Sequence, residues 1–229
     1  MMICPCRFTY DRWGYTTGDQ IWGMRVASHQ AHSTDGQVDH IFPDWTPDLV
    51  IVCESAWAYH HPYYATVPHV VWGVDNHVRD YRQAGIEHYF LAHNAPSIMD
   101  MKAKDVTWLP CGYDPIAFTP STIPFDERKF DITLIGVLYD SRVEVLNAMT
   151  KAGLKVQAGT GLLYEDYAQA YHNSRIALNI SAKGDLNQRI FETAALGCVV
   201  LSEPLEDADN LKLDWIQTFK DSKDAIKQA

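Results

Sequence analysis

The sequence lacks any long hydrophobic run. Within its 229 residues, no uninterrupted apolar stretch approaches the roughly 18 residues that a membrane-spanning helix requires. The first seven residues, MMICPCR, also lack the apolar core of a secretory signal peptide. We therefore expect neither a membrane span nor a secretion signal in this chain.

Basic residues are scarce relative to acidic ones. The chain has 19 Lys and Arg against 29 Asp and Glu, which gives a formal net charge of -10 and a pI near 5.3. This balance disfavours a surface that wraps nucleic acid by counterion release, although a local basic groove remains open. DNA is accordingly the least favoured partner.

Cysteine is also sparse, and the number of cysteines is odd. Cys4, Cys6, Cys53, Cys111 and Cys198 are scattered, mostly beside apolar residues of strand-like segments. We therefore expect reduced, buried thiols rather than disulfides, because a disulfide framework needs paired cysteines at regular spacing. Reduced thiols indicate a cytoplasmic location.

Histidines offer the one hint of a metal centre. His29 and His32 are spaced for one helix face, and His60 and His61 follow further along the chain. No Cys or carboxylate stands near them at the spacing of zinc ligands. We therefore predict no metal site.

Strand-like and helix-like segments alternate along the chain. In the first half, apolar and β-branched runs predict strands at 3–8, 38–42, 48–53, 69–74 and 88–92, and capping-box spacing at 17–20 predicts a helix start. In the second half, we expect strands at 132–136, 155–158, 176–180 and 199–202, and helices at 142–152, 165–171, 188–196 and 222–229. Such alternation implies parallel sheets joined by crossover helices.

The chain length suits two small α/β domains. Between residues 111 and 130 the alternation lapses into Gly, Pro, Ser and Thr, a composition typical of a linker. We therefore predict an N-terminal Rossmann-like domain over 1–115, a linker over 116–130 and a C-terminal Rossmann-like domain over 131–229. Each domain would have roughly 100 residues, within the usual size range.

Polar residues gather at one strand-to-helix junction, in the segment NISAKGDLNQRIFETAALGCVVLSE (179–203). In open α/β sheets, ligands bind outside the carboxyl ends of the strands, where helix N-termini favour phosphate. Arg189 in the first helical turn could meet a diphosphate, and Glu192, on the same face as Gln188, could accept hydrogen bonds from two ribose hydroxyls. The segment therefore predicts a site for a nucleotide carrying a sugar and a diphosphate.

Each candidate also has a simpler structural interpretation. Arg189 and Glu192 could be a solvated pair on a helix surface. Gly14 could shape a turn rather than approach a ligand. Asp75 and His77 follow an apolar strand, where α/β folds place their chemistry, but either could instead cap the next helix.

Three further segments accompany the segment 179–203. They are the connecting segment WLPCGYDP (108–115), the strand and loop FDITLIG (130–136) with Arg142 six residues on, and VVWGVDNH (70–77). Together the four segments resemble the CgeB-like, spore-maturation type glycosyltransferases of the GT-B fold. The match extends from about residue 70 to 203. It departs at Gly184, which stands where related retaining enzymes have the first of two Glu eight positions apart.

The resemblance implies an α/β, GT-B-like fold in a compact version, with two Rossmann-like domains whose parallel sheets face each other across a cleft. It implies an enzyme of the hexosyltransferase type that moves a sugar from a nucleotide-diphosphate sugar to an acceptor hydroxyl, with a UDP-sugar as the first expectation. The mechanism would be independent of metal, with no cofactor beside the sugar nucleotide as co-substrate. The N-terminal domain would bind the acceptor and the C-terminal domain the donor.

The resemblance also implies roles for single residues. The Gly136 amide and Arg142 would bind or neutralise the leaving diphosphate, with Lys183 and Arg189 adding positive charge where the donor bond breaks. Asp75 or His77 would be the base in an inverting enzyme, whereas a retaining enzyme needs none. The residues implied in donor binding are Gly14, Gly136, Arg142, Asn179, Lys183, Asn187, Gln188, Arg189 and Glu192.

Three other functions remain open on the sequence. The chain could be a non-catalytic module that binds nucleotide sugars, or an enzyme of the same fold that hydrolyses or epimerises the donor. Its small size would also suit a viral enzyme that glycosylates hydroxymethylpyrimidine bases of DNA in the host cytoplasm. The acceptor could otherwise be a glycan, a protein or a small molecule.

Overall fold

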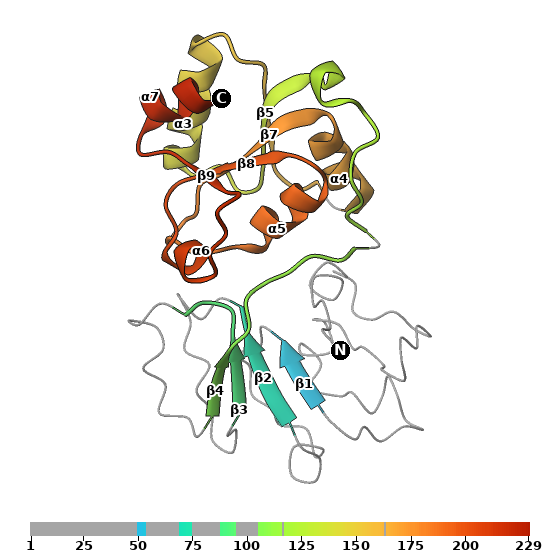
Figure 1. Ribbon diagram of the computed structural model, residues 1–229, viewed down its shortest axis with the longest axis vertical. Helices are drawn as coiled ribbons and strands as arrows, with labels where there is room; N and C mark the ends of the chain where they lie inside the picture. Colours follow the sequence, from blue (N-terminus) through green and yellow to red (C-terminus); the bar gives the residue numbers. More distant parts are fainter. Residues whose placement is uncertain (1–49, 54–68, 75–87, 95–104, 116, 163) are drawn as a thin grey trace. The chain divides into compact units, whose positions relative to one another are not determined.

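The computed structural model describes residues 50–53, 69–74, 88–94, 105–115, 117–162 and 164–229 (Figure 1). The chain divides into two compact units, Met1–Pro110 and Cys111–Ala229. The predicted strands at 3–8 and 38–42 and the helix start near residue 20 lie outside the described residues.

The first unit contains a sheet of four parallel strands in the order β1-β2-β3-β4 (Figure 1). These strands are β1 (Val50–Cys53), β2 (His69–Gly73), β3 (His88–Leu91) and β4 (Asp105–Trp108). The first three confirm strands predicted from apolar runs. β4 was not predicted, because Asp105 and Thr107 interrupt its apolar pattern. The indole N–H of Trp108 donates to the carbonyl of Ala92 (3.1 Å) and so ties the end of β4 to the segment after β3.

The second unit contains a five-stranded parallel sheet in the order β6-β5-β7-β8-β9. Its strands are β5 (Phe130–Ile135), β6 (Val156–Gly159), β7 (Ser174–Asn179), β8 (Val199–Ser202) and β9 (Gln217–Thr218). Its helices are η3 (Phe125–Glu127), α3 (Asp140–Lys151), α4 (Tyr164–His172), α5 (Gln188–Ala195), α6 (Glu206–Asn210) and α7 (Ser222–Gln228). The predicted strands and helices of this half are confirmed, whereas the short elements β9 and α6 were not expected.

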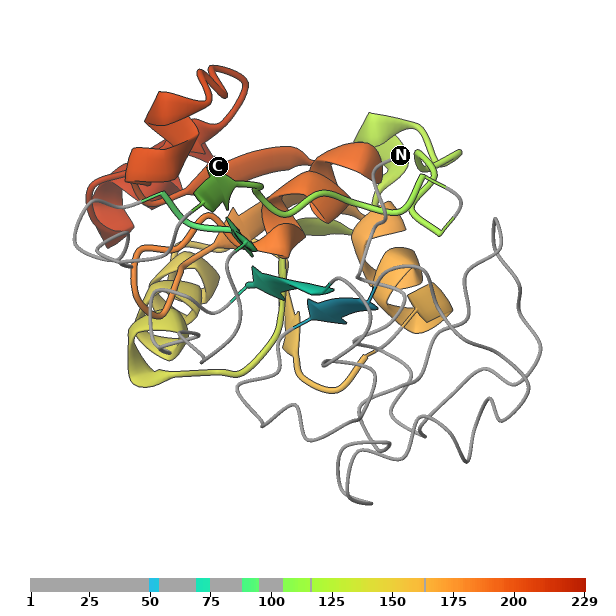
Figure 2. The same ribbon diagram turned by 90° about the horizontal axis from the view of Figure 1, so that it is seen from below.

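Side chains that alternate along the strands build a core on each face of this sheet. On one face, Ile132 and Leu134 of β5 pack with Leu146 and Met149 of α3. On the other face, Ile135 packs with a group of buried residues that includes Tyr167, Ala168 and Tyr171 of α4. Figures 1 and 2 accordingly show α3 (yellow) and α4 (light orange) well apart, on either side of this unit. The sheet is therefore covered on both faces, as expected for parallel strands.

The described residues of the predicted linker, 116–130, pack against the second unit. The ring of Phe118 is buried and meets Tyr167 edge-on at 6.0 Å between centroids. Arg128 is buried as well, and its Nη1 donates to the carbonyls of Ser174 (2.9 Å) and Gly197 (2.7 Å). These contacts explain why the division of the chain falls before this segment, between Pro110 and Cys111.

The α/β class with two parallel sheets, expected of a GT-B-like chain, is thus confirmed. That the two sheets face each other across a cleft stays a prediction.

Candidate functional site

The sheet of the second unit forks at the carboxyl ends of β5 and β7. The chain runs from β5 to β6 on one side of β5 and then crosses to β7 on the other side. The pairing of β5 with β6 continues to Ile135 and Gly159, whereas among the described residues its pairing with β7 stops at Thr133 and Ala177. A reversal of strand order that separates two strand ends is where open α/β sheets bind ligands.

On its β7 side, Ile135 forms hydrogen bonds with side chains instead of with the backbone of β7. Its N–H donates to the hydroxyl of Tyr171 (3.0 Å), and its carbonyl accepts from Nε of Arg189 (3.1 Å). Nη1 of Arg189 also donates to Oδ1 of Asn179 at the end of β7 (3.2 Å). Arg189 therefore bridges the two separated strand ends. It lies in the first turn of α5, as the sequence predicted, and its contact with a diphosphate stays a prediction.

Arg142 reaches the same fork from the first turn of α3. Its Nε donates to the carbonyl of Ile180 (2.7 Å) and its Nη1 to that of Val137 (2.6 Å), and its guanidinium lies 5.0 Å from the ring centroid of Tyr139. The pKa of Arg142 is lowered, first by burial and then by the positive charge of Arg189. The two cations are therefore close enough to repel each other.

Gly136 allows both arginines to approach the backbone. Its φ is +152°, and a Cβ there would lie 2.7 Å from Nη2 of Arg189 and 3.4 Å from Nη1 of Arg142. Its N–H donates to the carbonyl of Gly159 (2.8 Å) and is engaged within the sheet. The contribution of Gly136 to the site is therefore its missing side chain, which leaves room for the two guanidinium groups.

Two helices begin at this fork without a capping side chain. Tyr139 precedes α3 and Asn187 precedes α5, and neither side chain accepts a hydrogen bond from its helix. Uncapped N-termini of this kind favour an anion, because their N–H groups carry partial positive charge. Together with the two arginines, they make the fork suited to a phosphate or diphosphate group.

Two asparagines support Arg189 at the fork through hydrogen bonds. Asn179 is buried, donates through Nδ2 to the hydroxyl of Ser202 (3.0 Å) and accepts from Nδ2 of Asn187 (2.9 Å) as well as from Arg189. Oδ1 of Asn187 is buried and has no hydrogen-bond partner among the described residues. Asn179 therefore holds Arg189 at the fork, and Asn187 supports Asn179. The donor-binding roles expected of both asparagines stay predictions.

Glu192 lies inside the unit, one turn after Gln188. Its side chain is only 2% exposed, and Nε2 of Gln188 donates to its Oε1 (2.5 Å). Burial raises its pKa from the ordinary 4.5 to about 7, although hydrogen bonds from Tyr167 and Gln188 and the charge of Arg189 oppose the shift. The interpretation of Glu192 as part of a solvated surface pair is therefore wrong.

The loop before α5 is ordered around Ser181. The hydroxyl of Ser181 accepts from the backbone N–H groups of Lys183 (3.1 Å) and Asp185 (2.8 Å) and donates to the Asp185 carboxylate. The Ser181 N–H donates to Glu203 (2.6 Å), and burial raises the pKa of that carboxyl. Lys183 itself is exposed at the surface of this loop.

Three residues that support the site from other elements were not predicted from the sequence: Tyr167, Tyr171 and Ser202. The one available signal was the pair of tyrosines four residues apart, which places them on one face of α4. The predicted site residues Gly14, Asp75 and His77 lie outside the described residues, and their roles stay predictions.

The described part of the chain shows neither a metal-binding cluster of three or more His, Cys, Asp or Glu side chains nor a helix long and apolar enough to cross a membrane.

The second unit is thus an open parallel α/β sheet with a cationic site at the fork between β5 and β7. Residues 123–229, slightly less than half of the chain, match a family model described as glycosyl transferase-like. Over these residues the chain is similar to that family. No curated protein matches the chain at a significant level.

A crystal structure of a GtfA/B complex is similar to the chain with a TM-score of 0.49 and 11% sequence identity. The similarity covers 72% of this chain but only 46% of the solved chain, so this protein spans less than half of that structure.

Proposed function

We propose that this protein is a glycosyltransferase of the CgeB-like subtype, which moves a sugar from a nucleotide-diphosphate sugar to an acceptor hydroxyl. A UDP-sugar is the first donor to test. The observation that carries the proposal is the meeting of the Arg142 and Arg189 guanidinium groups beside Gly136, at the fork of a unit similar to glycosyl transferase-like proteins. The partner on the donor side is therefore an anionic nucleotide.

In this proposal the two arginines stabilise the leaving group. When the bond between sugar C1 and the diphosphate oxygen breaks, negative charge grows on the diphosphate. Two guanidinium groups and the start of α3 or α5 stabilise that charge without a metal ion. Lys183 adds a third positive charge from the loop before α5.

Glu192 and Gln188 would recognise the ribose of the donor. The depth of Glu192 means that a ribose reaches it only when side chains around the start of α5 move aside. Its carboxyl already has a hydrogen-bond donor in Gln188, so a ribose hydroxyl would replace or join that contact.

The acceptor hydroxyl needs a base if the configuration at C1 is inverted. Asp75 and His77, directly after the segment that contains β2, keep this role in the proposal. The oxygen of the deprotonated acceptor then forms the new bond to C1 as the bond to the diphosphate breaks.

The proposal is tested by incubating the protein with nucleotide sugars, with and without candidate acceptors, and measuring release of nucleoside diphosphate and transfer of sugar. The acceptor panel includes glycans, small alcohols, proteins and hydroxymethylpyrimidine DNA. We expect transfer that persists in the presence of a metal chelator. Binding without release would indicate a non-catalytic module, and release without a glycosylated acceptor would indicate a hydrolase; either result would contradict the proposed function.

A further inference from the structure

One rung of the sheet in the second unit is replaced by side chains. Gly136 donates its N–H to Gly159 of β6, and successive residues of a strand turn their N–H and carbonyl to opposite sides, so Ile135 turns these groups to the β7 side. Thr133, two residues earlier, lies opposite Ala177 of β7. Continued by two residues, this register would set Ile135 opposite Asn179. Instead, the N–H of Ile135 donates to Tyr171 and its carbonyl accepts from Arg189.

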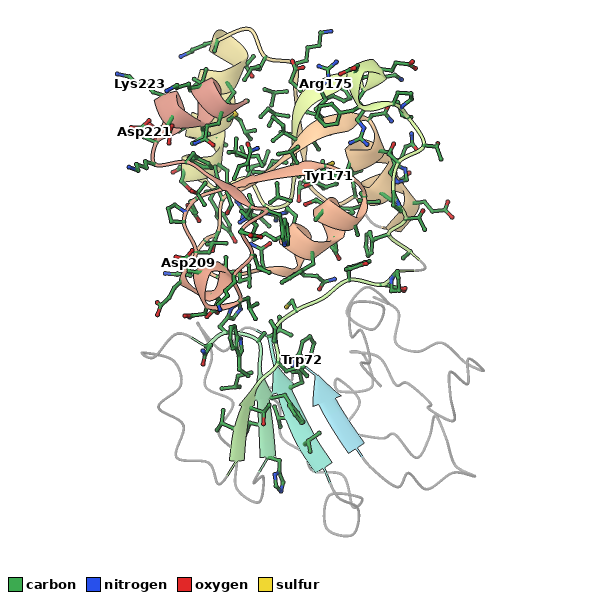
Figure 3. All side chains as sticks on the ribbon, viewed as in Figure 1. Trp72, Tyr171, Arg175, Asp209, Asp221 and Lys223 are labelled. Carbon is green, nitrogen blue, oxygen red and sulfur yellow. The ribbon has the colours of Figure 1, made fainter. Side chains whose placement is uncertain are left out.

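Tyr171 is well placed to accept the hydrogen bond from the N–H of Ile135. Its side chain is 0% exposed, and its ring packs against Tyr167 at 4.9 Å between centroids (Tyr171 is labelled in Figure 3). Its hydroxyl meets the backbone at the last residue of β5, directly before Gly136. A buried N–H that lost this acceptor would be left unpaired or would draw β5 toward β7.

We propose that Tyr171 is a positioning residue of the donor site, which holds the fork between β5 and β7 open. By occupying the N–H of Ile135, it keeps β5 from closing onto β7 and leaves the Ile135 carbonyl to orient Arg189. Gly136 then stays where both guanidinium groups can approach it. The proposal rests on the proposed function, because the fork is held open for the diphosphate of the donor.

The test compares Tyr171→Phe with Ser174→Ala in the full chain. Ser174 is also fully buried, and its hydroxyl donates to the carbonyl of Ile176 (2.8 Å) at the opposite end of β7. Each variant loses one buried hydroxyl, but only Tyr171→Phe loses one at the fork. UDP affinity is measured by calorimetry, and amide hydrogen exchange is followed at Ile135 and Gly136.

We expect Tyr171→Phe to weaken UDP binding about tenfold and to speed exchange at Ile135, as loss of one buried hydrogen bond implies. Ser174→Ala should lower the melting temperature but leave UDP affinity and exchange at Ile135 unchanged. A Tyr171→Phe, Arg189→Lys double variant should bind UDP more tightly than the two single losses multiplied together predict, because both side chains act on Ile135.

If Tyr171→Phe does not fold, 3-fluorotyrosine at position 171 keeps the ring and weakens the hydroxyl as an acceptor, and it should reduce UDP affinity in the same direction. If a folded Tyr171 variant bound UDP as tightly as the wild-type protein, or if exchange at Ile135 were unchanged, the positioning role would be overturned. Failure of the wild-type protein to bind any nucleoside diphosphate would instead overturn the proposed function.

Discussion

Arg142 and Arg189 carry the same charge but have different surroundings. Arg142 is 5% exposed, and two of its nitrogens are bound to the carbonyls of Val137 and Ile180. Arg189 is partly exposed and bonds the ends of β5 and β7. We infer that Arg142 acts on a bound diphosphate mainly through its charge, whereas Arg189 can also donate a hydrogen bond to it.

Substitution of Arg142 by Ala tests this difference. Alanine removes the charge together with both hydrogen bonds to the carbonyls, so the variant should lose about 1 to 3 kcal/mol of unfolding free energy. Turnover should fall more than donor affinity, because the charge acts most strongly as the diphosphate leaves. Denaturant titration and steady-state kinetics measure the two effects. Equal losses of turnover and affinity would show that Arg142 only anchors the bound donor.

The raised pKa of Glu192 predicts a pH dependence of stability. The folded carboxyl, with its pKa of about 7, holds its proton more tightly than the unfolded one at 4.5. Its stabilising contribution is therefore complete below pH 4.5 and is lost as the pH rises through 7. Relative to Glu192→Gln, the wild-type protein should lose up to about 3 kcal/mol of unfolding free energy across this range. Parallel stability curves for the two proteins would show that Glu192 does not titrate in this way.

At the scale of elements, the turn from β5 into α3 depends on Gly136. Gly136→Ala would place a methyl group 2.7 Å from Nη2 of Arg189, so the guanidinium would have to move. The matched control is Gly153→Ala, where φ is also positive, at +92°, but a Cβ would meet nothing within 4 Å. Both variants should lose about 1 to 3 kcal/mol of stability through backbone strain.

Only Gly136→Ala should also weaken UDP binding, by about tenfold or more, because it displaces a charged hydrogen-bond donor. Calorimetry with UDP distinguishes the two variants. If both bound UDP as the wild-type protein does, the close approach of Arg189 to the backbone would have no part in donor recognition.

The sequence predicted the elements whose pattern is local. The strands at β5, β7 and β8 follow from short apolar runs, and α5 from its helical spacing. The segments β4, β9 and α6 were missed, because they are short and rich in polar residues and take their structure from neighbouring strands or loops. Gln217–Thr218, for example, is a strand only because it pairs with β8.

The candidate site was predicted in part, because only some of its residues can be recognised from a local pattern. Asn179, Arg189 and Gly136 stand at strand ends or helix starts, positions that the chain order of an α/β fold brings together. Tyr171 could not be found in this way, because its bond to Ile135 joins residues 36 apart in the chain. The burial of Glu192 could not be predicted from a local pattern either, since it depends on how α5 packs against β7 and β8.

At the scale of the whole molecule, the proposed base of an inverting mechanism comes from the first unit. If the enzyme inverts, either Asp75 or His77 acts as the base. Substitution of that residue, as Asp75→Asn or His77→Ala, should lower turnover by about a hundredfold or more with little change in donor affinity. The other substitution should have a milder effect. Near-normal turnover in both variants would exclude the general base and favour a retaining mechanism.

The proposed function depends on binding of a nucleotide's diphosphate at the fork in the second unit. Calorimetric titration of UDP into the wild-type protein, Arg189→Gln and Arg175→Gln tests it most directly. Arg175 is the charge-matched control, since it pairs with Asp131 near the amino ends of β5 and β7. We predict that wild type and Arg175→Gln bind UDP equally and that Arg189→Gln binds at least about tenfold more weakly. Equal binding by all three proteins, or none by the wild type, would show that the fork does not bind the diphosphate.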